Sequence, residues 1–174
     1  MPRVLAVSLN PVRTFGKTPQ DEIRLVADYG VEGDTHAGAT LKTHNGMIEV
    51  NQRQVHLIAN ELLEEMAGRG YEIGPGEIGD NVLTEGVDLI NLPNHTRLRL
   101  GPEAVVELRG LRAPCLQLDR FARGLAGAML NKTGPGPKVR TGVLGVGVTG
   151  GIVRAGDAGE VELPLVPHLP MKPM

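Results

Sequence analysis

Two neighbouring stretches of sequence decide the fold: Thr96-Arg97-Leu98-Arg99-Leu100 and Ala104-Val105-Val106-Glu107-Leu108-Arg109. In the first, the leucines face one side and the arginines face the other. In the second, the apolar residues at positions 106 and 108 alternate with the charged residues at 107 and 109. Successive side chains of a β-strand point to opposite faces, so this period of two predicts two strands, each with one buried face.

Short apolar runs recur along the rest of the chain, separated by residues that form turns. The chain has 24 glycines and 13 prolines among 174 residues, which is typical of many short strands joined by tight turns. The strands predicted in this way are Val4–Ser8, Ile23–Ala27, Gln54–Ile58, Asn81–Thr84, Arg97–Leu100, Val105–Arg109, Leu144–Thr149, Ile152–Val153 and Glu160–Leu163.

Two helices interrupt the predicted strands. Asn60 is a suitable N-cap for the first, whose apolar stripe ends at Arg69-Gly70. The second begins at Pro114, because proline suits the first helical position, and its apolar positions recur as far as Met129. The run Gly134–Pro137 then ends it. We therefore predict a mainly β domain, a strongly bent sheet or β-barrel with two short α-helices at its rim.

The composition excludes several classes of function. The formal net charge is −2, and two tyrosines and two phenylalanines leave little for stacking on bases, so we expect no nucleic-acid surface. No stretch approaches the roughly 18 apolar residues of a membrane span, and the N-terminus lacks the apolar run of a signal peptide. A single cysteine cannot form an internal disulfide, which fits a reducing compartment. We expect a cytoplasmic protein that binds no membrane.

The single cysteine, Cys115, is placed where a thiol can become reactive. It follows Pro114 and so is predicted in the first turn of a helix, where free N–H groups favour an anion. Arg112 adds a positive charge three residues upstream. A thiolate is both a nucleophile and a soft metal ligand, which points to sulfur chemistry or to a soft metal. Cys115 could equally be a small buried hydrophobic residue, and the local residues leave both readings open.

Two polar loops carry further candidate ligand-binding residues. The glycine-framed loop Gly33–Gly38 contains Asp34 and His36, which could bind a ligand, although an aspartate in a turn often only satisfies nearby backbone N–H groups. A second loop, rich in glycine and proline, offers the neutral hydrogen-bonding groups of Asn81 and Thr84. Such groups can hold a heteroaromatic or phosphate-bearing ligand.

Two other patterns carry little weight. The segment Gly145–Gly150 matches the dinucleotide-binding pattern, but a strand follows it where that pattern requires a helix, so we interpret its glycines as sites of bulges and bends in a sheet. The spacing of His36, His44 and His56 matches no compact zinc site.

Taken together, these segments resemble the MOSC domain, named for the C-terminal domain of molybdenum cofactor sulfurase. The segments that carry the resemblance occur in the family's order and are Gly30–Gly38, Arg53–Leu57, Pro75–Asp88, Arg112–Cys115 and Gly150–Asp157. We assign residues 1–163 to this domain and residues 164–174 to a proline-rich tail.

The resemblance implies a bent β-barrel and a role for Cys115 as persulfide acceptor or as molybdenum ligand, with Arg112 as its basic neighbour. It also implies that polar segments distant in sequence line one pocket. The residues expected at this site, some of them as donors to the anionic phosphate of a pterin cofactor, are Asp34, His36, Arg53, Asn81, Thr84, Arg109, Arg112 and Cys115.

Two classes of function stay open. The first is a carrier that holds molybdenum cofactor (molybdopterin), or a sulfur atom on Cys115, with a cysteine desulfurase or a molybdoenzyme as donor or acceptor. The second is an enzyme in which molybdenum held by Cys115 reduces N-hydroxylated compounds with electrons from a separate flavoprotein. The chain shows no desulfurase domain, and hence no pyridoxal phosphate site of its own, and no ferredoxin-like domain, which favours the carrier. A domain with an inert buried cysteine is the third reading.

Overall fold

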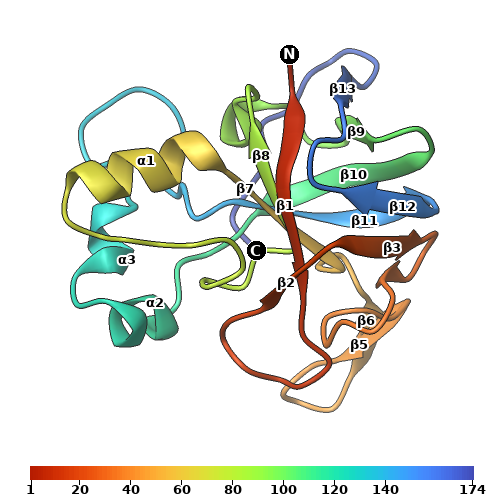
Figure 1. Cartoon of the computed structure of the whole chain (residues 1–174), viewed down its shortest axis with the longest axis horizontal. Helices are drawn as coiled ribbons and strands as arrows, with labels where there is room; N and C mark the ends of the chain where they lie inside the picture. Colours follow the sequence, from red (N-terminus) through yellow and green to blue (C-terminus); the bar gives the residue numbers. More distant parts are fainter.

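An eight-stranded sheet forms the body of the molecule, and the computed structural model describes all residues from 1 to 174 (Figure 1). Its strands lie in the order β13 (Gly159–Glu162), β9 (Arg97–Leu100), β10 (Ala104–Leu111), β11 (Val143–Thr149), β7 (Val55–Ala59), β8 (Val82–Glu85), β1 (Arg3–Leu9) and β2 (Thr18–Gln20). Neighbouring strands are antiparallel except β7 and β8, which are parallel. A second sheet contains β12 (Gly151–Arg154), β3 (Glu22–Val26) and β4 (Gly30–Val31), and a third contains β5 (Thr40–Lys42) and β6 (Ile48–Val50).

The two stretches with alternating residues form β9 and β10, which pair in antiparallel register with Val106 opposite Leu98. The leucines of β9 are buried and its arginines are exposed, as the alternation predicts. Glu107 on β10 is the exception, since it is buried although it is charged. Its carboxylate lies 3.0 Å from Arg97 Nε and 2.9 Å from Arg109 Nη2, and these ion pairs compensate its burial.

Every strand predicted from the sequence overlaps an observed strand, so the mainly β prediction is confirmed. The short strands β2, β4, β5 and β6 are not predicted. The glycines of Gly145–Gly150 lie in β11 and in the turn to β12, where neighbouring backbones come close. A Cβ atom at Gly145 would lie 2.7 Å from the carbonyl oxygen of Glu107, and one at Gly147 would lie 2.6 Å from that of Val26. These glycines therefore serve strand packing.

Neither the main sheet nor the smaller sheets close into a barrel, so the barrel prediction is not confirmed. β13 and β2 remain the edges of the main sheet. The backbone N–H of Val4 donates to Asp157 and that of Gly159 donates to Pro2, which brings β1 against the turn before β13. The N–H of Gly156 also donates to Val4, and one isolated bridge joins Arg3 and Ala158, but these contacts do not form a continuous pairing of strands.

The helices lie together on one side of the sheet (Figure 1). They are α1 (Asn60–Gly68), α2 (Leu116–Phe121) and α3 (Leu125–Ala128), with a 3-10 turn η1 (Leu89–Asn91). None of them is long and apolar enough to cross a lipid bilayer.

Three details of the helix prediction are wrong. The single helix predicted from Pro114 to Met129 is broken into α2 and α3, since Ala122 is extended with φ of −150° and Gly124 is left-handed with φ of 84°. Cys115 is the extended N-cap residue of α2 and does not lie in its first turn. At α1 the N-cap is Ala59, and Asn60 is already helical.

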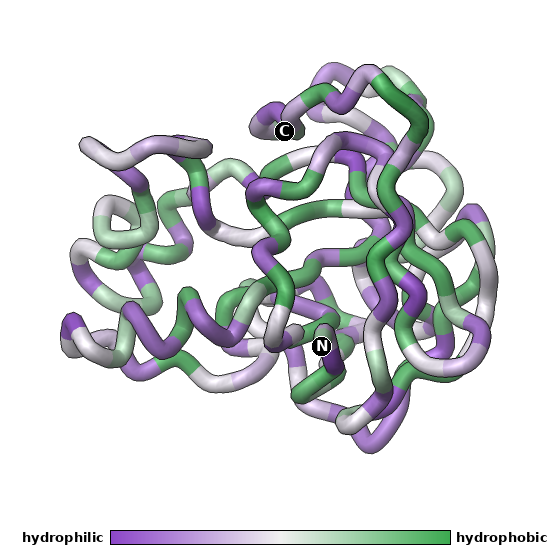
Figure 2. Tube along the Cα trace, turned by 90° about the horizontal axis from the view of Figure 1, so that it is seen from above, coloured by the Kyte–Doolittle hydropathy of each residue, from purple (hydrophilic) through white to green (hydrophobic).

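The core has two parts. Eighteen buried apolar residues fill the space enclosed by the bent main sheet and the β12–β3–β4 sheet. Nine others lie between the sheet and the helices and include Ile58 and Leu83 from the strands, Met66 from α1, and Leu118 and Leu125 from α2 and α3. Figure 2 shows the corresponding alternation of hydrophobic and hydrophilic residues along the chain trace.

The proline-rich segment that we assigned to a tail packs against the sheet. Asn94 N–H donates to Leu169, Leu111 N–H donates to Lys172, and Met174 N–H donates back to Leu111. Met171 is buried in the core. This C-terminal segment therefore lies along the end of β10 that leads to Cys115.

Candidate functional site

Cys115 lies where the main sheet passes into the helices. β10 ends at Leu111, the segment Arg112-Ala113-Pro114 follows, and α2 begins directly after the cysteine. The thiol is half-buried at the margin of the apolar cluster under α1, and its Sγ lies 3.9 Å from Gln117 Oε1. A free and partly exposed thiol in this position is accessible to a second molecule.

Arg112 provides a cation directly beside this thiol. The guanidinium lies over the ring of Phe15 at 5.8 Å from its centroid, and its Nη1 is buried without a hydrogen-bond partner. Burial lowers the pKa of Arg112, while the neighbouring Cys115 and Asp80 oppose this shift by stabilising the charged form. The arginine therefore has an unused donor and a charge that is weakly solvated.

A second charged group is formed by Lys17, Asp34 and His36. Lys17 Nζ lies 2.7 Å from Asp34 Oδ2, and the two side chains are 1% and 0% exposed. The same ammonium lies 3.2 Å from Nδ1 of His36, whose ring is half exposed. The other carboxylate oxygen of Asp34 accepts the backbone N–H of Asn10 at 3.0 Å. His36 is thus the member of this group that faces solvent.

Burial and charge oppose each other in the pair of Lys17 and Asp34. Burial alone would raise the pKa of Asp34, but hydrogen bonds from His36 and Lys17 and the charge of Lys17 outweigh it and hold that pKa far below its usual value. Burial lowers the pKa of Lys17, and the attraction of Asp34 offsets this only in part. Asp34 is therefore ionised at neutral pH.

Asp80 is within electrostatic reach of both Arg112 and Lys17. Both of its carboxylate oxygens accept the N–H of Gly76, at 3.1 and 3.0 Å, and the carbonyl oxygen of Gly76 accepts the N–H of Lys17 at 2.7 Å. Burial raises the pKa of Asp80, although Gly76 and the charges of Arg112 and Lys17 act against this. We refer to Lys17, Asp34, His36, Asp80, Arg112 and Cys115 as the Cys115 cluster.

Two of the predicted site residues, Asn81 and Thr84, hold the backbone beside this cluster. Asn81 Oδ1 accepts the N–H of His56 at 3.0 Å, and Asn81 Nδ2 donates to the carbonyl oxygen of Ser8 at 3.1 Å. Thr84 Oγ1 donates to the carbonyl oxygen of Ile58. Both side chains are buried, and their hydrogen bonds to other residues join β1, β7 and β8.

Two predicted arginines lie outside the Cys115 cluster. Arg53 is exposed and is connected to the Asp34 loop through Asn51, which accepts the N–H of Arg53 and donates to the carbonyl oxygen of His36 at 2.9 Å. Arg109 is held by Glu107 on β10.

Sequence reasoning missed Lys17, Phe15 and Asp80. Lys17 is a lone lysine in a loop, and no local pattern marks it as a residue that becomes buried. Asp80 lies in the glycine- and proline-rich segment Pro75–Asp88, which carries part of the family resemblance. Its place in that segment was a signal from which it could have been predicted as a site residue.

Comparison with known proteins identifies the family of this chain. The family model described as the MOSC domain matches residues 32–160, which include every member of the Cys115 cluster except Lys17. The chain belongs to the MOSC domain family. Members of this family are associated in general with binding of molybdenum cofactor and with the handling of sulfur.

Solved structures share the fold of this MOSC domain. The YuaD protein from Bacillus subtilis is 25% identical with a TM-score of 0.78, over 95% of this chain and 98% of that protein. YiiM from Geobacillus stearothermophilus is 15% identical with a TM-score of 0.72, over 98% and 80% of the two chains. YiiM from Escherichia coli is 21% identical with a TM-score of 0.64, over 96% and 73%. No functionally curated protein matches the chain.

Proposed function

We propose that this MOSC domain carries sulfur on Cys115, accepting it from a persulfide donor and delivering it to a metal–sulfur cofactor. The observation that supports this proposal is the position of a half-buried free thiol directly beside the Arg112 guanidinium. A neighbouring cation favours the thiolate, which is the nucleophilic form of cysteine. The charge of Lys17 is paired with Asp34, so Arg112 is the cation expected to act on the thiol.

The proposed step needs no oxidant or reductant beyond the donor. The Cys115 thiolate attacks the outer sulfur of a persulfide, R–S–SH, formed on a cysteine desulfurase. A new S–S bond forms to Cys115, the S–S bond of the donor breaks, and its electron pair leaves on the donor thiolate. The proton stays on the transferred sulfur, so atoms and charge balance. Arg112 stabilises the negative charge before the attack.

The same cluster fits molybdenum cofactor as an alternative cargo. A thiolate is a soft metal ligand, and the unpartnered Nη1 of Arg112 suits an anionic group. Cys115 would hold the metal and Arg112 would balance negative charge. When bound, the cofactor supplies redox chemistry, and the expected activity is then reduction of N-hydroxylated compounds with a separate flavoprotein as electron donor.

The test is sulfur transfer to the purified protein. We expect incubation with a cysteine desulfurase and cysteine to add one sulfur atom to the wild type, read by intact mass spectrometry and reversed by a thiol reductant. Cys115→Ser should gain none. Arg112→Ala should be sulfurated more slowly, whereas Arg109→Ala, a matched loss of an arginine outside the Cys115 cluster, should behave as the wild type.

Elemental analysis of protein purified from its own host separates the two cargoes. About one molybdenum atom per protein molecule in the wild type, and none in Cys115→Ser, would favour molybdenum cofactor over sulfur as the cargo. Absence of both sulfur transfer and molybdenum would leave Cys115 as an inert residue.

A further inference from the structure

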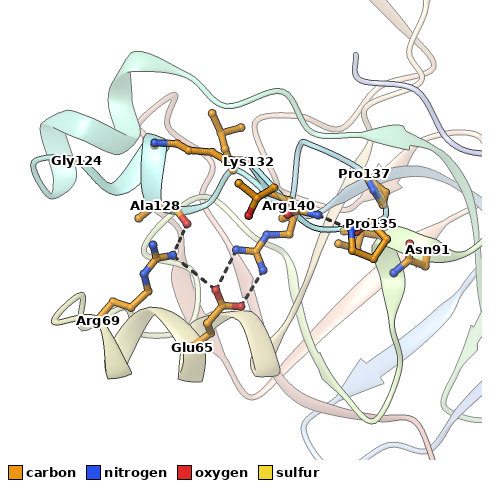
Figure 3. A pocket seen from close by; sticks show the side chains of 14 residues that line it. Glu65, Arg69, Asn91, Gly124, Ala128, Lys132, Pro135, Pro137 and Arg140 are labelled. Carbon is orange, nitrogen blue, oxygen red and sulfur yellow. Dashed lines mark hydrogen bonds and ion pairs between the residues drawn. The ribbon is translucent and has the colours of Figure 1, made fainter.

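A cavity of about 700 Å³ lies between α1, α3 and the loop that follows α3 (Figure 3). None of its lining residues belongs to the Cys115 cluster. The walls are formed from α1 by Glu65 and Arg69, from η1 by Asn91, and from the long loop by Lys132 and Arg140. Volumes of this size are typical of sites for small molecules.

The lining of this cavity is positively charged. The lining contains three cations, Arg69, Lys132 and Arg140, and one carboxylate, Glu65, so the formal charges sum to +2. Arg140 holds Glu65 with both terminal nitrogens, at 2.8 and 3.0 Å, and its Nε is buried without a partner. Lys132 is exposed and forms no ion pair. The cavity therefore keeps cationic groups that its own carboxylate does not satisfy.

The arginines are already held in place. Arg69 Nη1 donates to the carbonyl oxygen of Ala128 at 2.8 Å and lies 3.6 Å from Glu65 Oε1 (Figure 3). Glu65 therefore lies between Arg69 and Arg140 and orients both. Cations fixed in this way lose little side-chain freedom when an anion binds.

A second cavity of about 350 Å³ adjoins the first and shares Glu65, Ile90 and Arg140 with it. Half of its twelve lining residues are hydrophobic, among them Leu62 of α1 and Val87. The second cavity is also lined by the carboxylates of Glu61 and Asp88, which accept hydrogen bonds from the Gly86 N–H and the Asn91 side-chain amide. The two cavities together thus offer a cationic compartment beside one that is half hydrophobic.

We propose that the two cavities form a binding site for a small phosphorylated molecule with an apolar body. The phosphate occupies the compartment of Arg69, Lys132 and Arg140, because a net charge of +2 matches a phosphate dianion and the Lys132 ammonium and Arg69 Nη2 form no hydrogen bond within the protein. The apolar body enters the second cavity beside Ile90. This site is independent of the chemistry at Cys115.

Isothermal titration with three probes tests the site: phenyl phosphate, inorganic phosphate and phenol. We expect phenyl phosphate to bind about tenfold more tightly than either of the others, since only it fills both compartments. Lys132→Gln, which disturbs no internal contact, should weaken the binding of phenyl phosphate about tenfold, and Arg69→Gln should weaken it by a similar factor. Lys42→Gln on the exposed strand β5 removes the same charge elsewhere and should have no effect.

Failure of phenyl phosphate to bind, or equal affinity in Lys132→Gln and the wild type, would overturn the proposal. Equal affinities for phenyl phosphate and inorganic phosphate would remove the second cavity from the site. Cys115→Ser should bind phenyl phosphate as the wild type does, and loss of binding in that variant would contradict a site separate from the Cys115 cluster.

Discussion

Lys17 and Asp34 form an ion pair from which solvent is excluded. Removal of one partner leaves the other charge buried and unpaired, so we expect Asp34→Asn and Lys17→Met each to lower the free energy of unfolding by about 3 kcal/mol. The measurement is urea unfolding at neutral pH. In the double variant the free energy of unfolding should fall by clearly less than the sum of the two single decreases, because no buried charge is then left unpaired. Additive losses would show that the two side chains do not act as a pair.

Arg112 is expected to control the reactivity of Cys115, because it is the cation directly beside the thiol. Arg112→Ala should slow alkylation of Cys115 by iodoacetamide about fivefold at neutral pH, because the cation beside the attacking sulfur is lost. Arg112→Lys should recover part of the rate. Arg109→Ala serves as the control, since Arg109 is held by Glu107. An unchanged rate in Arg112→Ala would mean that Arg112 does not activate the thiol.

At the scale of elements, the loop around Gly76 fixes the position of Lys17. Gly76 has φ of 77°, and a Cβ atom there would collide with the carbonyl oxygen of Lys17 and lie 2.7 Å from Ser8 Oγ. We expect Gly76→Ala to destabilise the protein by about 3 kcal/mol, from backbone strain together with this collision. Gly70→Ala has a similar φ of 91° but no atom within 4 Å, so it should cost only about 1 kcal/mol. Equal losses in urea unfolding would refute the steric contact.

Local patterns were enough to predict every strand of four or more residues, and contacts between distant segments account for much of what was missed. The alternation in β9 depends only on which face of the strand is buried, so the sequence reveals it directly. The break between α2 and α3 includes the left-handed residue Gly124. The apolar spacing of the sequence is equally compatible with one unbroken helix, so it does not reveal the break. The burial of Lys17 depends on a glycine far along the chain, which no local pattern reports.

In the candidate site too, local sequence identified individual residues but not their contacts. Asp34, His36, Arg112 and Cys115 were singled out as polar or reactive residues, but their grouping followed from the family resemblance and not from spacing. Arg109 was assigned to the site by its charge alone, and the structure pairs it with Glu107. Charge indicates that a side chain needs a partner, and only the fold determines which partner it finds.

At the scale of the whole molecule, stability should fall in acid. Burial would raise the pKa values of Asp34 and Glu107, but hydrogen bonds and neighbouring cations lower both in the folded state. A carboxylate with a lowered folded pKa stabilises the protein above its unfolded pKa of about 4, and this contribution is lost as the pH falls through and below that value. Asp80, whose pKa is raised by burial, acts in the opposite sense.

We therefore expect the free energy of unfolding to decrease between about pH 5 and pH 2. The difference between the wild type and Asp34→Asn should shrink over the same interval, since the unfolded wild type then binds a proton on Asp34 that the folded protein does not bind. Urea unfolding at a series of pH values measures both. A difference that does not change with pH would contradict the assignment of a lowered pKa to Asp34.

The pairing of β12 with β3 sets residues 151–154 against residues 22–25. Contacts between such distant segments slow folding, so we expect refolding in milliseconds to seconds, with the amides of β3 among the last to gain protection in pulsed hydrogen exchange. During synthesis, at about 5 to 20 residues per second, β3 emerges from the ribosome many seconds before its partner. Throughout that interval its edge is open to other nascent chains, and the yield of correctly folded protein should depend on how fast translation proceeds.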